Sequence, residues 1–145
     1  MRHFTWKELT RTTSKLPNIP NSIQKANIEY LINNLIDPLQ DRFKFKIKVN
    51  SCFRSPAVNT AVGGANSSQH MANNGAAIDI TCQNNLLLFK TIELGYNFDQ
   101  LIWEFGSSKS PQWIHVSLKK FGNRKQVLRA IKKNGKTVYE PFEDM

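Results

Sequence analysis

The chain has 145 residues, with 20 lysines and arginines against 11 aspartates and glutamates, so its formal net charge is +9. A length of this order suits one folded unit with a modest core, and we expect a single domain over residues 1–145. Its hydrophobic and charged shares, 40% and 21%, are typical of a soluble globular protein. No apolar run is long enough to span a membrane.

The two cysteines, Cys52 and Cys82, are too few for a disulfide-stabilised scaffold. Cys82 alternates with Ile78 and Ile80, which indicates a small buried thiol, and the sequence leaves open whether the two cysteines pair. The first residues, MRHFTWKELT, lack the uninterrupted apolar segment of a secretory signal. We therefore expect synthesis in the cytoplasm without a signal peptide.

The chain begins with a helix signal. Thr5 and Glu8 have the spacing of a capping box, in which each side chain bonds the other residue's backbone, so a short helix is expected here. Pro17 and Pro20 end it and predict an extended linker.

Asn21 or Ser22 begins the longest predicted helix. Apolar residues recur there at helical spacing and predict the face that packs on the core: Ile23, Ala26, Ile28, Leu31, Leu35 and Leu39. Pro38 should kink or break this helix near Asp37, because proline cannot donate a backbone hydrogen bond.

Residues 45–49 alternate apolar side chains with lysines and predict a strand whose lysines face outward. This strand leads to Arg54. Ser55 and Pro56 then suit a helix cap followed by proline in the first turn, and the Gly63-Gly64 pair marks the end of that helix. Further on, Asn84 or Asn85 caps a helix through Leu94, with Gly95 in a left-handed C-terminal position.

Two later runs each carry one potential metal ligand on the face opposite an apolar one. Alternation isolates Asp79 in this way within residues 76–82, and His115 within residues 113–118. The chain has three histidines; His70 lies just before the first of these runs, and His3 lies near the N-terminus. A catalytic zinc ion takes three such protein ligands and keeps one position open. Composition alone, however, favours two ordinary half-buried strands with unrelated polar residues.

Sequence motifs favour the metal site. In order, the motifs are SCFRSP, AVGGA, SQH, GAAID and WIHV. This set resembles the zinc D-alanyl-D-alanine carboxypeptidases, which share a metal-site fold with the L-alanyl-D-glutamate endopeptidases and the hedgehog signalling domains. The resemblance covers residues 4–118, since FTWKELT also resembles the start of the small members.

The resemblance implies roles for individual residues. His70, Asp79 and His115 match the ligands of one zinc ion. Arg54 matches an arginine that receives a substrate carboxylate, and Ser68 matches a serine that hydrogen-bonds the substrate or the loop backbone. The segment between His70 and Gly75 is longer here than is usual in the family, and it lies in a predicted loop.

A hairpin around residues 106–111 supplies a candidate general base. Its register pairs Glu104 with Trp113 and Ile102 with His115, which puts Glu104 on the face that carries His115. The corresponding family position also resembles a glutamate that precedes the last ligand strand. Glu104 is therefore the predicted base, and Asp99 is the alternative.

Residues 119–145 form a basic C-terminal extension beyond the resemblance. From residue 119 to residue 136 the chain has no acidic residue, and it carries Lys119, Lys120, Arg124, Lys125, Arg129, Lys132, Lys133 and Lys136. Such charge favours anionic partners, here the polymers of a bacterial wall. Nucleic acid is not expected, because the run has few aromatic residues for stacking and no reading motif. An Asn-Gly pair at 134–135 predicts a terminal hairpin.

Together these observations predict an α+β domain in which N-terminal helices pack on a small, mainly antiparallel sheet that carries a zinc site. The resemblance implies a zinc metallopeptidase that hydrolyses peptidoglycan peptides, as a D-alanyl-D-alanine carboxypeptidase or a wall endopeptidase. Small size and basicity suit a phage endolysin or a virion-associated hydrolase acting at the cell wall. The alternative is a non-catalytic, zinc-stapled module that binds the wall or a partner protein.

Overall fold

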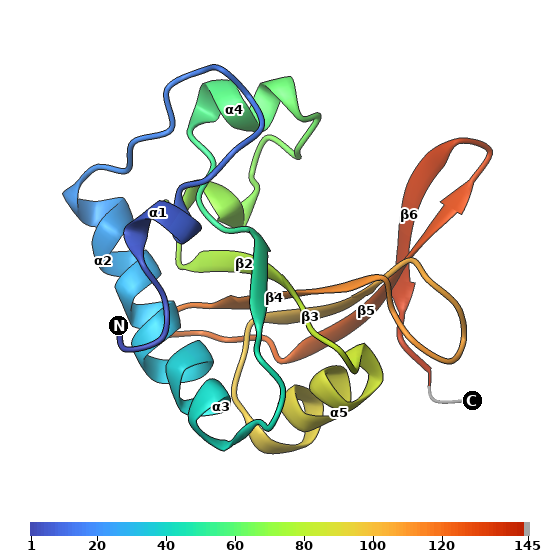
Figure 1. The fold of residues 1–145 in the computed structure, drawn as a ribbon. Coiled ribbons are helices and arrows are strands. Elements are labelled where there is room, and N and C mark those ends of the chain that lie inside the picture. The colour runs from blue at the N-terminus through green and yellow to red at the C-terminus, as the bar shows by residue number, and fades with distance from the viewer. Residues whose placement is uncertain (144–145) are drawn as a thin grey trace.

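The computed structural model describes residues 1–143 and shows an α+β fold built on one mixed sheet (Figure 1). Its strands follow the order β1-β2-β4-β3-β5-β6. Four neighbouring pairs are antiparallel, and β3 and β5 are parallel. The strands are β1 (Lys48–Ser51), β2 (Ala76–Thr81), β3 (Gln100–Glu104), β4 (Trp113–Leu118), β5 (Gln126–Lys133) and β6 (Lys136–Pro141). The predicted domain 1–145 and its basic extension end at residues 144 and 145, which lie outside the described part.

The helices lie mostly in the first half of the chain. They are α1 (Trp6–Leu9), α2 (Ser22–Leu31), the π-helix η1 (Ile32–Ile36), α3 (Asp37–Arg42), α4 (Pro56–Ala61), the short 3₁₀-helix η2 (Gln69–Met71) and α5 (Asn85–Gly95). Within residues 1–143, no helix has both the length and the apolar character needed to cross a membrane.

The predicted helix starts are confirmed. Thr5 and Glu8 form a complete capping box at α1, and Asn21 caps α2. The predicted apolar stripe was wrong in the first turns of α2, where Ile23 is 68% exposed. Gln24 is buried there instead, and its side-chain amide donates to the Asn73 side chain at 3.1 Å. A polar loop therefore covers this turn, and apolar packing begins further along the helix.

Pro38 does not end the helix. The chain changes to π-helical hydrogen bonding over Ile32–Ile36 and continues helically to Arg42. A π-helical segment changes the local hydrogen-bond pattern and so accommodates a residue that cannot donate. The neighbouring Asp37 is buried, and its carboxylate accepts the backbone N–H of Arg2 at 2.7 Å.

One hydrophobic cluster joins the helices to one face of the sheet. It includes Ile28 and Leu31 of α2 together with Ile78 and Ile80 of β2. Helix α5 runs from its Asn84 cap through Gly95. The left-handed conformation predicted for Gly95 was wrong, since the chain leaves this helix at Tyr96 in an extended conformation.

The opposite face of the sheet carries the polar residues. Asp79 pairs with His115, and His115 pairs with Ile102. Directly paired residues project from the same face, so these three side chains share it. The predicted register of the β3–β4 hairpin, Glu104 opposite Trp113, is confirmed.

The predicted terminal hairpin is also confirmed, with β5 and β6 joined by a turn in which Asn134 and Gly135 have φ of 53° and 77°. These are the conformations that a two-residue Asn-Gly turn requires. The hairpin belongs to the central sheet, because β5 pairs with β3.

Candidate metal centre and active-site cleft

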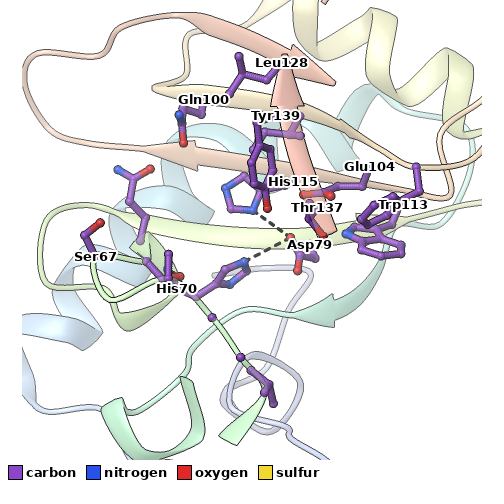
Figure 2. Close-up of a pocket in the computed structure, with 18 of the residues that line it drawn as sticks. Ser67, His70, Asp79, Gln100, Glu104, Trp113, His115, Leu128, Thr137 and Tyr139 are labelled. Carbon is purple, nitrogen blue, oxygen red and sulfur yellow. Dashed lines mark hydrogen bonds and ion pairs between the residues drawn. The ribbon is translucent and has the colours of Figure 1, made fainter. Parts of the chain in front are cut away.

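Three of the predicted site residues meet on the polar face of the sheet (Figure 2). Asp79 and His115 are direct neighbours on the paired strands β2 and β4, which fixes their spacing. The Oδ1 atom of Asp79 lies 3.0 Å from Nδ1 of His115 and 3.3 Å from Nε2 of His70. The two imidazole centroids are 5.0 Å apart.

His70 reaches this cluster from the loop that follows α4. Its backbone N–H donates to the Ser68 hydroxyl at 3.2 Å, which starts the short helix η2. Its ring atom Nδ1 lies 2.7 Å from the carbonyl oxygen of Cys52. A carbonyl can only accept, so Nδ1 carries a proton, and Nε2 is the ring atom that faces Asp79. Ser68 thus contacts the loop backbone, one of the two partners predicted for it.

The geometry and chemistry of this set fit a zinc ion. The candidate ligand atoms all lie within 4.8 Å of one another, and two atoms bound to one tetrahedral zinc are about 3.4 Å apart. His70 and Asp79 are buried and His115 is 13% exposed, so the set opens only toward the cleft. Two neutral imidazoles and one carboxylate would leave the ion a net positive charge.

The Asp79 carboxylate is ionised, as a metal ligand must be. Burial by itself would raise its pKa. The His70 imidazole and the hydrogen bond from His115 outweigh burial and hold the pKa of Asp79 well below its usual range.

Glu104 lies on the same face, two residues along β3 from Ile102, which pairs with His115. Its side chain is 6% exposed and lines the cleft. Burial raises the pKa of Glu104 to about 7; His115 opposes the shift and the Asp79 carboxylate adds to it. A carboxyl with a pKa near neutrality can both take and return a proton, which is what a general base requires.

Arg54 lies beside the candidate metal ligands. Its Nη2 atom is 3.6 Å from Oδ2 of Asp79, and its Nε donates to the Ser51 hydroxyl at 3.4 Å. The Gly63-Gly64 loop packs against it: a Cβ atom at Gly64 would lie 2.0 Å from Oδ1 of Asn59 and 3.2 Å from Nη1 of Arg54. The loop therefore needs glycine at Gly64 to bring the Arg54 guanidinium to the cleft.

Asp99, the alternative base, has another environment. Its carboxylate is fully buried and accepts from the Arg124 side chain at 2.7 Å and from the Arg124 backbone N–H at 3.0 Å. Burial acts against these contacts, yet they lower the pKa of Asp99 to about 2. It does not line the cleft, and its ion pair leaves it a poor proton acceptor.

An open cleft of about 1260 Å³ surrounds the cluster. One rim comes from the His70 loop and the Gly63-Gly64 turn, and the other comes from the β5–β6 hairpin. The hairpin residues Leu128, Thr137 and Tyr139, and the Cys52 carbonyl, had no assigned role in the sequence. Alternation along residues 136–139 does place Thr137 and Tyr139 on one face, but only the pairing of β5 with β3 brings that face to the metal ligands. Both cysteines are free.

In a comparison with protein-family models, the Peptidase M15 model matches residues 2–117 of the chain. The chain belongs to the peptidase M15 family. This is the family of zinc peptidases that contains D-alanyl-D-alanine carboxypeptidases and endopeptidases. No curated protein is significantly similar to the chain.

As an M15 family member, the chain carries all three of its candidate zinc ligands and Glu104 within the matched residues. The β5–β6 hairpin (Gln126–Pro141) lies beyond the match. One rim of this M15 cleft is therefore built by a segment that the family model does not cover.

Proposed function

We propose that the chain is a zinc-dependent peptidase that hydrolyses a bond next to a D-amino acid in the peptides of bacterial peptidoglycan. The observation that carries the proposal is the convergence of three zinc-compatible side chains and a separate buried carboxylate, Glu104, in one open cleft. A purely structural zinc site has four protein ligands. Among the described residues, the only group of potential ligands close enough to share a metal ion has three members, His70, Asp79 and His115. Three protein ligands are the number found in catalytic zinc sites.

A zinc ion held by these residues would supply Lewis-acid chemistry, polarising the scissile carbonyl and acidifying water. Glu104 takes the proton of the attacking water and returns it to the nitrogen of the leaving amine. Burial of Glu104 makes both transfers feasible near neutral pH, because its pKa of about 7 lies close to that of the medium.

Arg54 and Ser68 position the substrate. The planar guanidinium of Arg54 lines the cleft beside Asp79 and can pair with a peptide carboxylate through two parallel hydrogen bonds. The Ser68 hydroxyl accepts from the His70 backbone and can still donate its own proton to a bound peptide. This arrangement suits a substrate whose carboxylate lies near the scissile bond, as in D-alanyl-D-alanine.

The net charge of +9 supports action at the bacterial cell wall, whose anionic polymers would attract the protein. We assign it the role of a small wall hydrolase of phage type, released at lysis or carried on the virion. Nucleic acid is not a proposed partner.

The test is incubation of the zinc-loaded protein with purified peptidoglycan, followed by mass spectrometry of the soluble products. Release of D-alanine identifies a carboxypeptidase, and release of peptides identifies an endopeptidase. Glu104→Gln should lower the rate by about 10²–10⁴-fold, the usual contribution of general acid–base catalysis, with unchanged zinc content. If the wild type binds peptidoglycan and releases nothing, the proposal is wrong and the chain is a zinc-containing binding module.

A further inference from the structure

The β5–β6 hairpin forms a wall of the cleft. In Figure 1 strand β6 turns away from the plane of the central strands at the end of the sheet. The hairpin residues that line the cleft are Leu128, Lys132, Thr137, Tyr139 and Pro141. The hairpin is thus placed to contact whatever binds at the metal ligands.

Tyr139 lies in one cross-strand row with the candidate base. Glu104 pairs with Ala130 across β3 and β5, and Ala130 pairs with Tyr139 across β5 and β6. Paired residues project from one face, so Glu104 and Tyr139 both face the cleft. The residue between them is a fully buried alanine, so no large side chain separates them.

The Tyr139 hydroxyl is a hydrogen-bond donor that the fold leaves unused. Figure 2 shows the side chain projecting from β6 toward His115. Within residues 1–143 its hydroxyl has no hydrogen-bond partner, and the residue is 55% exposed. Partial burial raises the pKa of Tyr139 above its usual value, and the Glu104 and Asp79 carboxylates add to the effect. The group therefore keeps its proton at neutral pH.

We propose that Tyr139 is a further catalytic residue, whose hydroxyl donates a hydrogen bond to the scissile carbonyl oxygen as negative charge develops on it. The proposal rests on the peptidase function given above. A donor aimed at the place where charge develops stabilises the transition state more than the ground state.

The step balances without any change in the protonation of Tyr139. The water oxygen bonds to the carbonyl carbon, the carbonyl π pair moves to its oxygen, and the water proton passes to Glu104. The Tyr139 O–H bonds to that oxygen while it is negative. When the pair returns, the C–N bond breaks and the amine nitrogen receives the proton from Glu104.

Tyr139→Phe tests the hydroxyl alone, because it keeps the ring. We expect kcat to fall by about 10²-fold, the usual effect of one such donor, while KM and zinc content stay close to those of the wild type. Tyr96→Phe is the matched control: Tyr96 packs against the core and does not line the cleft, so this variant should keep the wild-type kcat.

A second readout does not depend on turnover. Calorimetry of the zinc-loaded protein with the phosphinate analogue of D-alanyl-D-alanine measures affinity for a tetrahedral, negatively charged group. Tyr139→Phe should weaken phosphinate binding by about 10²-fold, and Tyr96→Phe should not change it.

The outcomes separate the two proposals. If Tyr139→Phe has wild-type kcat and phosphinate affinity, the role of Tyr139 is wrong and the peptidase function stands. The donor role is also wrong if Tyr139→Ala has a reduced kcat while Tyr139→Phe does not, since the ring alone would then contact the substrate. If the wild type cleaves no wall peptide but Tyr139→Phe still weakens phosphinate binding, Tyr139 donates to a bound anion, but the peptidase function fails and the catalytic role of Tyr139 fails with it. If the wild type binds no phosphinate and cleaves nothing, both are wrong.

Discussion

The His70 ring is held by the backbone of Cys52, with 2.7 Å between Nδ1 and the carbonyl oxygen. The backbone N–H of Arg54 in turn donates to the carbonyl oxygen of His70 at 2.9 Å. The segment that carries Arg54 and the loop that carries His70, a candidate metal ligand, therefore hold each other in place. Metal affinity depends on such orientation of ligands by their hydrogen-bond partners.

Loss of a ligand should remove the metal. We expect His115→Ala to lose most of its zinc, because two remaining ligands cannot complete the three-ligand site. Elemental analysis of purified protein gives the zinc content per chain. His3→Ala is the control, since His3 pairs with Asp41 on the surface and its loss should leave zinc unchanged. Full zinc in a His70→Ala, His115→Ala double variant would place the site elsewhere.

Activity should depend on the ionisation of Glu104. Only the carboxylate accepts a proton, so kcat/KM should rise as pH increases through the pKa of Glu104. That pKa is about 7 without a metal, and a nearby cation favours the carboxylate, so the acidic limb should have its midpoint at or below pH 7. A pH–rate profile measures it. An identical acidic limb in the residual activity of Glu104→Gln would assign it to another group.

Arg54→Lys should weaken substrate binding although it preserves the charge. An ammonium group cannot reproduce the two parallel hydrogen bonds of the guanidinium, so KM for a peptide with a free carboxylate should rise by about tenfold. Steady-state kinetics measure this. Arg42→Lys on the exposed end of α3 is the control. Kinetics equal to the wild type in Arg54→Lys would remove Arg54 from the binding site.

Gly64→Ala should damage both stability and activity. The added Cβ would lie 2.0 Å from Oδ1 of the buried Asn59 side chain. Relief of this overlap should lower the free energy of unfolding by about 1–3 kcal/mol, which urea unfolding would measure. It should also displace Arg54 and so reduce activity, which steady-state kinetics would measure. Gly95→Ala adds a Cβ with no heavy atom within 4 Å and should be neutral or slightly stabilising. Equal stability of the two variants would refute the predicted overlap.

Asp99 should stabilise the fold in a defined pH range. Its pKa is about 2 in the folded protein, against 3.8 ordinarily. Its contribution is therefore complete above pH 3.8 and is lost as pH falls through about 2. At neutral pH we expect Asp99→Asn to lower the free energy of unfolding by about 2 kcal/mol, measured by urea unfolding. Asp41→Asn removes an exposed carboxylate and should have a much smaller effect. An equal decrease in the free energy of unfolding of both variants would contradict a stabilising role for Asp99.

The polar faces of β2 and β4 could be predicted because alternation is a local signal, whereas the candidate metal ligands were singled out by the resemblance of their motifs to a zinc peptidase family. Alternation assigned Asp79 and His115 to the polar face, and the short connection after Glu104 set the hairpin register, both of which the structure confirms. The buried side of α2 was predicted only in part, because Gln24 packs on a loop far away in the sequence.

The remaining features depend on contacts that no local pattern encodes. The Cys52 carbonyl belongs to the backbone, so no side chain marks it as the partner of His70. The place of Tyr139 in the cleft follows from the parallel pairing of β5 with β3, which brings residues 126–141 back beside Glu104. Roles for Arg54, Ser68 and Glu104 stay predictions until the variants are measured.

The strand order places the base of the cleft on inner strands of the sheet and its two rims on less supported segments. Asp79 and His115 stand on β2 and β4, which both have a hydrogen-bonded neighbour on each side, whereas the rims are a loop at one end and a terminal hairpin at the other. Amide hydrogen exchange should accordingly be slowest beneath the metal ligands and faster in the rims. Exchange of the rim sequences should therefore change which ligands the cleft binds without displacing the candidate metal ligands.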